Sequence, residues 1–204
     1  MTVFGPALVS FDVEDAVRDT LRTWIHDYLG EHERHSPYWA LGQIQRPRSW
    51  QLVSDYRDPK ADRQLPCIAV ESAEEESLPA AGGMVDGEWG FNVTVIAKDN
   101  DRDGTRRVVS AYVGAIKRIL WQKGSLGGLA ADVTVGSVSY DAVNAAKAKT
   151  VAGATIRIVV TVPEVASRWG GPNEPTPPVD PPPPTSPTDP LHTSTNVNVS
   201  AELP

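Results

Sequence analysis

Residues 89–122 of the chain read WGFNVTVIAKDNDRDGTRRVVSAYVGAIKRILWQ. In the first nine of them, apolar side chains, mostly aromatic or β-branched, occupy every second position from Trp89 to Ala97. This alternation predicts a strand with one face on a hydrophobic core. After an acidic turn at residues 99–104, the apolar residues recur at helical spacing and form one stripe: Val108, Val109, Tyr112, Val113, Ile116, Ile119 and Leu120. We therefore expect a strand, a short turn and an amphipathic helix in succession.

The predicted helix has suitable residues at both ends. Asp99, Asn100 and Asp101 can each accept a hydrogen bond from the free N–H groups at a helix start. Three cations fall within residues 117–123, near the other end, where the helix dipole favours positive charge.

Another amphipathic helix is expected near the N-terminus. Its apolar residues are spaced three or four apart: Val13, Val17, Leu21, Trp24 and Tyr28. Ser10 or Asp12 would cap its start, and Gly30 would end it.

Further segments have the pattern of strands. Leu65–Glu71 is a short apolar run, and the strand around Trp89 extends over Met84–Lys98. Asp132–Tyr140 and Thr150–Val162 follow the second helix. The last strand should end before Pro163, because proline has no N–H group for the ladder.

Two segments are expected to be loops. Ser72–Gly83 is a polar, acidic connector between the first two strands. Residues 31–64 are punctuated by proline and form a long loop, with a short strand near Ser49–Val53. A loop of this length is usually functional or covered by a partner.

The order of these elements predicts an α+β fold. We expect a mainly antiparallel sheet of about four strands with two helices packed on one face. The opposite sheet face would be polar, and either wet or in contact with a neighbouring subunit. Its residues are Asn92, Thr94, Thr155, Arg157 and Thr161. The folded domain is assigned to residues 1–169, and residues 170–204 are assigned to an extended, proline-rich C-terminal tail.

The composition of the tail differs sharply from that of the domain. Eleven of the 18 prolines fall at or after Pro172, which favours a polyproline II conformation without a core. Residues 193–203 alternate again, with Val197 and Val199 among the apolar positions, and predict a terminal strand that could add to another chain's sheet edge.

Charge and cysteine content exclude several classes of protein. The net charge of −7 argues against a protein that wraps nucleic acid through its phosphates. The single cysteine, Cys67, allows no intrachain disulfide, which fits a reducing cytoplasm. The N-terminus has no signal-peptide pattern, and no apolar stretch has membrane-spanning length. We expect no membrane association.

The acidic turn contains the sharpest chemical pattern. Asp99, Asp101, Asp103 and Gly104 match the first half of an EF-hand calcium loop, but Ser110 stands where a bidentate acid is needed. We favour a capped helix start over a calcium site.

His26, His32 and His35 do not follow the H-E-x-x-H pattern, and we interpret them as a solvated helix end. No nucleophile–base set is evident, so we expect neither an enzyme nor a cofactor or metal.

With no complete catalytic or metal-binding pattern in the sequence, we expect the protein to act through surfaces that bind other proteins. The chain has six tryptophans, and several aromatic residues fall outside the predicted elements. Such residues often anchor interfaces, although they also seal a domain's own edges. Our interface candidates are Trp39, Trp50, Tyr56, Trp169, Val197 and Val199.

The pattern resembles a known family. The N-terminal helix, the strings LPCIAV (65–70) and WGFNVTV (89–95), the helix Arg106–Trp121 and the strand Ala154–Val162 are similar to tail terminator (tail-completion) proteins of long-tailed bacteriophages, in particular of phages that infect actinobacteria. The likeness covers about residues 10–165 and depends on the order of elements and these short strings. The tail and the long loop extend beyond the family pattern.

The resemblance implies a structural virion protein made in the host cytoplasm. Family members form a hexameric ring that caps the tail tube, ends its polymerisation and joins the tail to the head connector. The expected partners are other copies of the chain, the tail-tube protein and connector proteins, while DNA passes through the lumen without specific binding. Glu74, Glu75 and Glu76 are our candidates for the lumen side, by charge alone. The alternatives are another neck component such as a head–tail adaptor, a tail-tube subunit, or a small metal-dependent enzyme using the acidic turn.

Overall fold

The computed structural model describes residues 8–51, 61–79, 84–141 and 150–167. These residues form two long helices, α1 (Ser10–His35) and α2 (Arg102–Lys123), and two short 3-10 helices, η1 (Ala61–Gln64) and η3 (Leu126–Gly128). Four strands complete the fold: β1 (Cys67–Pro79), β2 (Met84–Asp99), β3 (Asp132–Asp141) and β4 (Thr150–Ser167). No helix among the described residues is long and apolar enough to cross a membrane.

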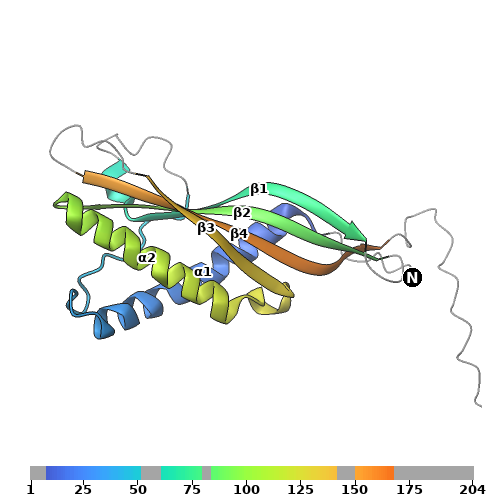
Figure 1. Cartoon of the computed structure of the whole chain (residues 1–204), viewed down its shortest axis with the longest axis horizontal. Helices are drawn as coiled ribbons and strands as arrows, with labels where there is room; N and C mark the ends of the chain where they lie inside the picture. Colours follow the sequence, from blue (N-terminus) through green and yellow to red (C-terminus); the bar gives the residue numbers. More distant parts are fainter. Residues whose placement is uncertain (1–7, 52–60, 80–83, 142–149, 168–204) are drawn as a thin grey trace, which may run out of the picture.

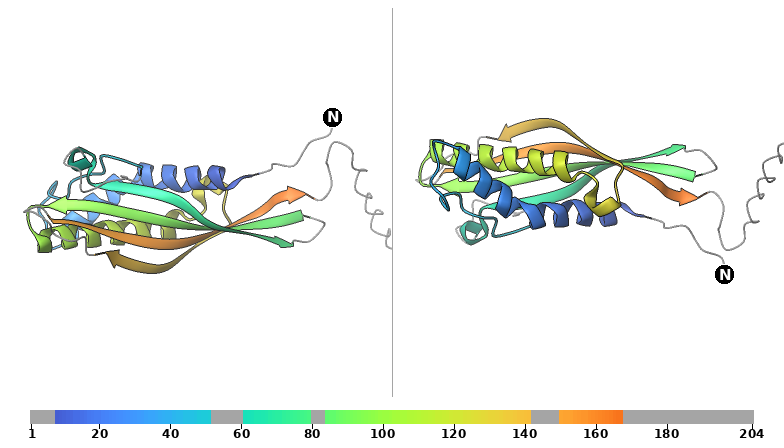
Figure 2. Two further views of the ribbon diagram at one scale, coloured as in Figure 1. Left: turned by 90° about the horizontal axis from the view of Figure 1, so that it is seen from above. Right: turned by 90° about the horizontal axis from the view of Figure 1, so that it is seen from below.

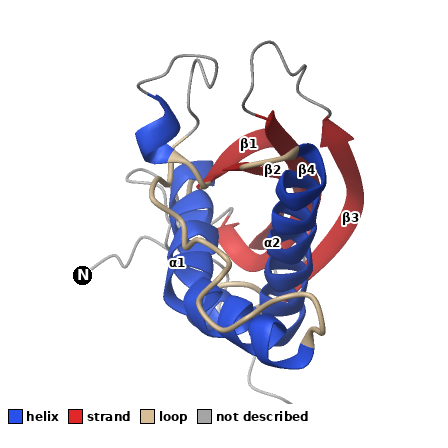
Figure 3. Cartoon of the chain, turned by 90° about the vertical axis from the view of Figure 1, so that its left-hand side faces the viewer, coloured by secondary structure: helices blue, strands red, loops and turns tan. Residues whose placement is uncertain are grey.

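The strands form one antiparallel sheet in the order β1-β2-β4-β3, and both helices pack on the same face of it (Figure 1). Seen from the end of the molecule, α1 lies beneath the β1 side, and α2 lies beneath the centre and the β3 side (Figure 3). The predicted α+β architecture is confirmed. The proline-rich tail lies outside the described residues.

The stretch at residues 89–122 folds as predicted. Trp89, Phe91, Val93, Val95 and Ala97 all face the helices and are at most 2% exposed. The whole predicted stripe of α2 is buried against them. Burying an aliphatic side chain of this size contributes about 1.5–3 kcal/mol, so this strand–helix pair supplies much of the hydrophobic core.

Helix α1 differs from the prediction at both ends. Val9 is the residue before the helix, so neither Ser10 nor Asp12 is the cap residue. The Val9 N–H donates a hydrogen bond (3.1 Å) to the carboxylate of Asp12, which lies in the first turn. The helix also continues through Gly30 to His35. Its buried stripe steps by four residues, and Trp24 and Tyr28 flank it half-buried. The stripe consists of Val13, Val17, Leu21, Ile25 and Leu29.

Two strands are longer than their sequence patterns indicate. Most of the expected connector Ser72–Gly83 is strand, because β1 continues through Pro79 and pairs with β2, with one irregularity between Ser72 and Glu74. The rest of that connector, residues 80–83, lies outside the described residues. Likewise β4 does not stop at Pro163 but continues to Ser167. The pairing of β4 with β2 skips from Val162 to Ala166, so Pro163 lies in an irregular stretch where its missing N–H is tolerated.

The predicted short strand near Ser49–Val53 is reduced to a single parallel bridge between Ser49 and Cys67. The remainder of that prediction, beyond Gln51, lies outside the described residues.

Candidate functional site

The sheet face without helices is polar over its middle, as predicted, whereas at the end opposite the β1–β2 tip Cys67, Ile96 and Val151 form a small apolar cluster with Leu65. Side chains of neighbouring strands lie opposite each other on it, including the hydroxyls of Thr94 and Thr155, whose oxygens are 3.3 Å apart. Asn92 pairs with Arg157 in register, and Glu88 pairs with Thr161. These side chains are half-buried or exposed, so the face is available for contact.

An ion pair crosses this face over a glycine. The Glu74 carboxylate on β1 bonds to the Arg157 guanidinium on β4, so the two side chains bridge β2 between them. Gly90 of β2 lies directly beneath the Glu74 side chain, since a Cβ at this position would be 2.6 Å from Glu74 Cγ. Gly90 therefore provides the space through which Glu74 reaches Arg157.

The sheet projects beyond the helices at one end. Figures 1 and 2 show β1, β2 and β4 continuing past both helices. We call this projection, residues 76–79, 84–88 and 161–167, the β-arm. Pairing between β3 and β4 stops at Thr161, so within the described residues nothing pairs with the outer edge of β4 beyond Thr161. The β-arm thus has two open edges, and such edges are templates for pairing with another chain.

A tryptophan packs at the base of the β-arm. Trp89 is 2% exposed and lies over Gly87, where an added Cβ would be 2.1 Å from an indole carbon. The indole therefore fills the volume that any side chain at Gly87 would need. This packing covers the helix-side face of the sheet where the β-arm begins.

A buried carboxylate holds the loop that follows α1. Glu33 accepts hydrogen bonds from the backbone N–H groups of Gly42 (3.0 Å) and Ile44 (2.6 Å) and from the guanidinium of Arg46 (3.0 and 3.2 Å). Burial alone would raise the pKa of Glu33, but these hydrogen bonds outweigh it and hold the pKa below its usual value of 4.5. The carboxylate is therefore ionised at neutral pH and fully partnered.

Three further hydrogen bonds tie this loop to the domain. The Tyr112 hydroxyl of α2 donates to the carbonyl of Gln45 (2.5 Å), and burial raises the pKa of Tyr112 far above its usual range. The Arg48 N–H donates to the carbonyl of Pro66 (2.8 Å), and the Ile68 N–H donates to that of Ser49 (3.0 Å). Residues 36–51 are thus an ordered loop.

The aromatic candidates in this loop pack on their own domain. Trp39 and Trp50 are both half-buried against the core, and the Arg22 guanidinium lies 5.9 Å from the Trp50 ring centroid. Tyr38 is the most exposed aromatic side chain of the loop, at 70%, and sequence reasoning did not select it. The sequence gives no signal for Tyr38, because the residues that surround it in space come from other parts of the chain.

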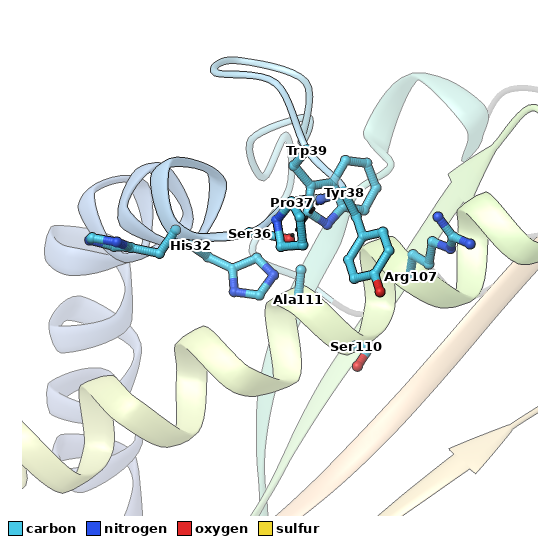
Figure 4. A pocket seen from close by; sticks show the side chains of 9 residues that line it. His32, Ser36, Pro37, Tyr38, Trp39, Arg107, Ser110 and Ala111 are labelled. Carbon is cyan, nitrogen blue, oxygen red and sulfur yellow. Dashed lines mark hydrogen bonds between the residues drawn. The ribbon is translucent and has the colours of Figure 1, made fainter.

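An open groove separates the end of α1 from the first turns of α2 (Figure 4). It has a volume of about 510 Å³, and the Arg107 guanidinium lies 5.4 Å from the Tyr38 ring centroid at one side. Aromatic, histidine and small side chains line it: His32, His35, Ser36, Pro37, Tyr38, Trp39, Arg107, Ser110 and Ala111. We call it the aromatic groove. His32 and His35, interpreted from sequence as a solvated helix end, are both exposed and belong to its rim.

The acidic turn is accounted for by helix capping. Asp101 is the residue before α2, and its carboxylate accepts the N–H of Gly104 (2.6 Å). Asp99 accepts the N–H of Asn100 (2.8 Å). Within the ranges that the structure describes, no group of three or more His, Cys, Asp or Glu side chains is arranged to hold a metal ion.

The lumen candidates Glu74, Glu75 and Glu76 lie on β1 and not on a connector. All three are exposed; Glu74 and Glu76 point to the helix-free face, whereas the register of Glu75 with Trp89 places it on the opposite one. The other interface candidates, Tyr56, Trp169, Val197 and Val199, lie outside the described residues.

No protein-family model matches the chain, and a search of curated proteins finds no match.

Proposed function

We propose that this chain is a structural virion protein that assembles into a ring, caps the tube of a long phage tail and joins the tail to the head connector. The observation that carries the proposal is the β-arm, which projects beyond the helices with two open edges. The order of elements on which the family resemblance depends, helix–strand–strand–helix–strand–strand, is also present.

The two sheet features would supply different parts of a subunit contact. An open strand edge pairs through backbone hydrogen bonds, whereas the helix-free face offers threonine, asparagine and charged side chains. A head-to-tail contact between two different surfaces generates a closed ring when the rotation closes. We infer that the helix-free face and the β-arm of neighbouring copies meet in this way.

The charge balance suits a ring through which DNA slides. Residues 171–204 contain four acids and no lysine or arginine, which leaves −3 of the total −7 for the rest of the chain. Basic walls would hold the phosphates. Glu74, Glu75 and Glu76 are exposed and stay our candidates for the lumen side. Glu75 fits that role best, because Glu74 and Glu76 lie on the helix-free face that we infer to contact a neighbouring copy.

The proposal is tested by the mass of the purified full chain in light scattering and by its binding to purified tail tubes, viewed by negative-stain electron microscopy. We expect a discrete ring, or a smaller species that caps tube ends. Open-ended polymers would instead indicate a tail-tube subunit. A protein that stays monomeric and does not bind tail tubes would overturn the proposal.

A pair of variants locates the contact. Thr94→Arg places a long cation in the middle of the helix-free face and should abolish ring formation. Thr23→Arg, on the exposed surface of α1, is the matched control and should leave the ring intact. A chain without residues 171–204 tests whether the tail, with Val197 and Val199, links neighbouring subunits. Unchanged assembly of this shortened chain would contradict that role.

A further inference from the structure

We propose that the aromatic groove binds the proline-rich segment at residues 177–184 of a neighbouring copy of this chain. The inference depends on the self-assembly in the proposed function, but it assigns a ligand to a site that assembly alone does not require. Its basis is the chemistry of the groove, the chemistry of the segment and the distance between them.

The groove has the composition of a polyproline-binding surface. Tyr38 is 70% exposed, and the rings of Pro37 and Trp39 accompany it on the same loop (Figure 4). Polyproline II segments dock into grooves lined by aromatic side chains and lose little conformational entropy when they do so. The loop that presents these rings is fixed by the buried carboxylate of Glu33, so the groove is formed in advance.

Charge selects the segment. Among the lining residues Arg107 carries a permanent positive charge, and its guanidinium is held over the Tyr38 ring at 5.4 Å. Residues 177–184 read PPVDPPPP, in which Asp180 is the only charged residue between two runs of proline. Pro178 and Pro181 give the PxxP spacing of such ligands, and Asp180 lies between them. Asp180 is therefore the expected partner of Arg107.

Distance assigns the segment to a neighbouring copy. The tail follows Ser167, which pairs with Met84 at the tip of the β-arm, whereas α2 begins beside Asp99 at the opposite end of the sheet. Seventeen residues of strand from Thr150 to Ser167 cover roughly 56 Å, and Arg107 lies about 8 Å along α2 from its start. Asp180 comes thirteen residues after Ser167, which would span about 40 Å as polyproline II and about 45 Å when fully extended. The chain's own groove lies up to roughly 48 Å from Ser167 by the lengths above, so Asp180 would reach it only if the tail ran fully stretched back along the molecule. A neighbouring copy requires no such path, and we assign the segment to it.

The test is a photo-crosslink in the full chain. Tyr38 is replaced by p-benzoylphenylalanine, which its exposure tolerates, and copies with this residue are mixed with nitrogen-15-labelled copies without it. Mass spectrometry of the crosslinked peptides should show attachment to residues 177–184 of the labelled copies. Attachment only within one chain, attachment elsewhere, or no attachment would overturn the proposal.

Charge-reversal variants check the chemistry. Arg107→Glu should lower the crosslink yield roughly threefold, as expected for an exposed ion pair, and Arg107→Glu combined with Asp180→Arg should restore it. Arg106→Glu is the matched control, since Arg106 is exposed on the same turn but does not line the groove. An equal loss in both single variants would contradict a specific pair.

The two proposals fail in different ways. A full chain that forms rings but gives no crosslink to residues 177–184 contradicts this inference alone. A full chain that stays monomeric in light scattering contradicts both.

Discussion

The guanidinium of Arg46 donates two hydrogen bonds to the carboxylate of Glu33, at 3.0 and 3.2 Å, across the loop that follows α1. The Glu33 side chain is 1% exposed, and that of Arg46 is 27% exposed. Because the carboxylate also accepts two backbone N–H groups, one charged side chain fixes the loop that carries Tyr38 and Trp39. Loss of this carboxylate should therefore affect both stability and the aromatic groove.

Replacing this carboxylate should be strongly destabilising. We expect Glu33→Ala to lower the free energy of unfolding by about 3–5 kcal/mol, because it leaves buried N–H groups and a cation without their partner. Glu31→Ala is the control: Glu31 forms an exposed ion pair with Arg118, and its loss should cost less than about 1 kcal/mol. Urea unfolding of the full chain measures both. Equal effects would contradict a special role for Glu33.

The same carboxylate predicts a pH dependence. The pKa of Glu33 is lowered in the folded protein, so its contribution to stability is fully present above the unfolded pKa near 4.5 and is lost as pH falls through the folded pKa. The difference in unfolding free energy between wild type and Glu33→Gln should be largest at pH 7 and should shrink below about pH 4.5. Urea unfolding at a series of pH values checks this. A difference that grew on acidification would show that the sign is wrong.

Gly87 should not tolerate a methyl group. An added Cβ would lie 2.1 Å from an indole carbon of the buried Trp89, so Gly87→Ala should cost about 1–3 kcal/mol through overpacking. In α2, Gly114→Ala has open space at its Cβ and should instead stabilise the protein by about 0.5–1 kcal/mol. Thermal unfolding of the two variants should shift in opposite directions. A shift in the same direction would contradict the packing at Gly87.

The effect of a methyl group at Gly90 should depend on Glu74. Gly90→Ala places a Cβ 2.6 Å from Glu74 Cγ and should displace the carboxylate from Arg157. Because this ion pair is exposed, we expect a cost of at most about 1 kcal/mol. The cost should disappear in the Glu74→Ala background, which a double-mutant cycle of unfolding free energies measures. Additive effects would mean that Glu74 is not the obstacle.

The cap of α2 can be separated from metal binding. Asp101→Ala should lower the unfolding free energy by about 1 kcal/mol, and Asp101→Asn should retain most of the stability because its amide oxygen can accept the same N–H. Asp103→Ala, which removes only a charge from the first turn, should cost about 0.3–1 kcal/mol. A calcium-dependent gain in stability that Asp101→Asn abolishes would favour the metal-binding alternative.

Periodic patterns in the sequence predicted the strands and helices that those patterns themselves determine. The alternation from Trp89 to Ala97 and the stripe of α2 appear in the structure as the sequence indicates, because each buries one face on the other. The helix-free sheet face was predicted for the same reason. The candidates in the tail lie outside the described residues, so they stay predictions.

The errors have causes outside the local sequence. Glu74, Glu75 and Glu76 look like a solvated loop, yet they extend β1 because β2 pairs with them and Arg157 lies across the sheet. Glu33 looks like any surface glutamate near a helix end, and Arg46 is thirteen residues away in a segment without periodicity. The aromatic groove was missed because its two walls, α1 and α2, are separated by more than sixty residues of chain.

The continuity of β2 has a mechanical consequence. This strand runs unbroken from Met84 at the tip of the β-arm to Asp99, and α2 begins at Arg102. Its ladder bonds to β1 and β4 lie across the strand direction, so a pull along the strand strains many bonds together and does not open them one after another. Tension applied at the tip is therefore carried in shear to the start of α2, and Arg107, which contacts Tyr38, lies in the second turn of that helix.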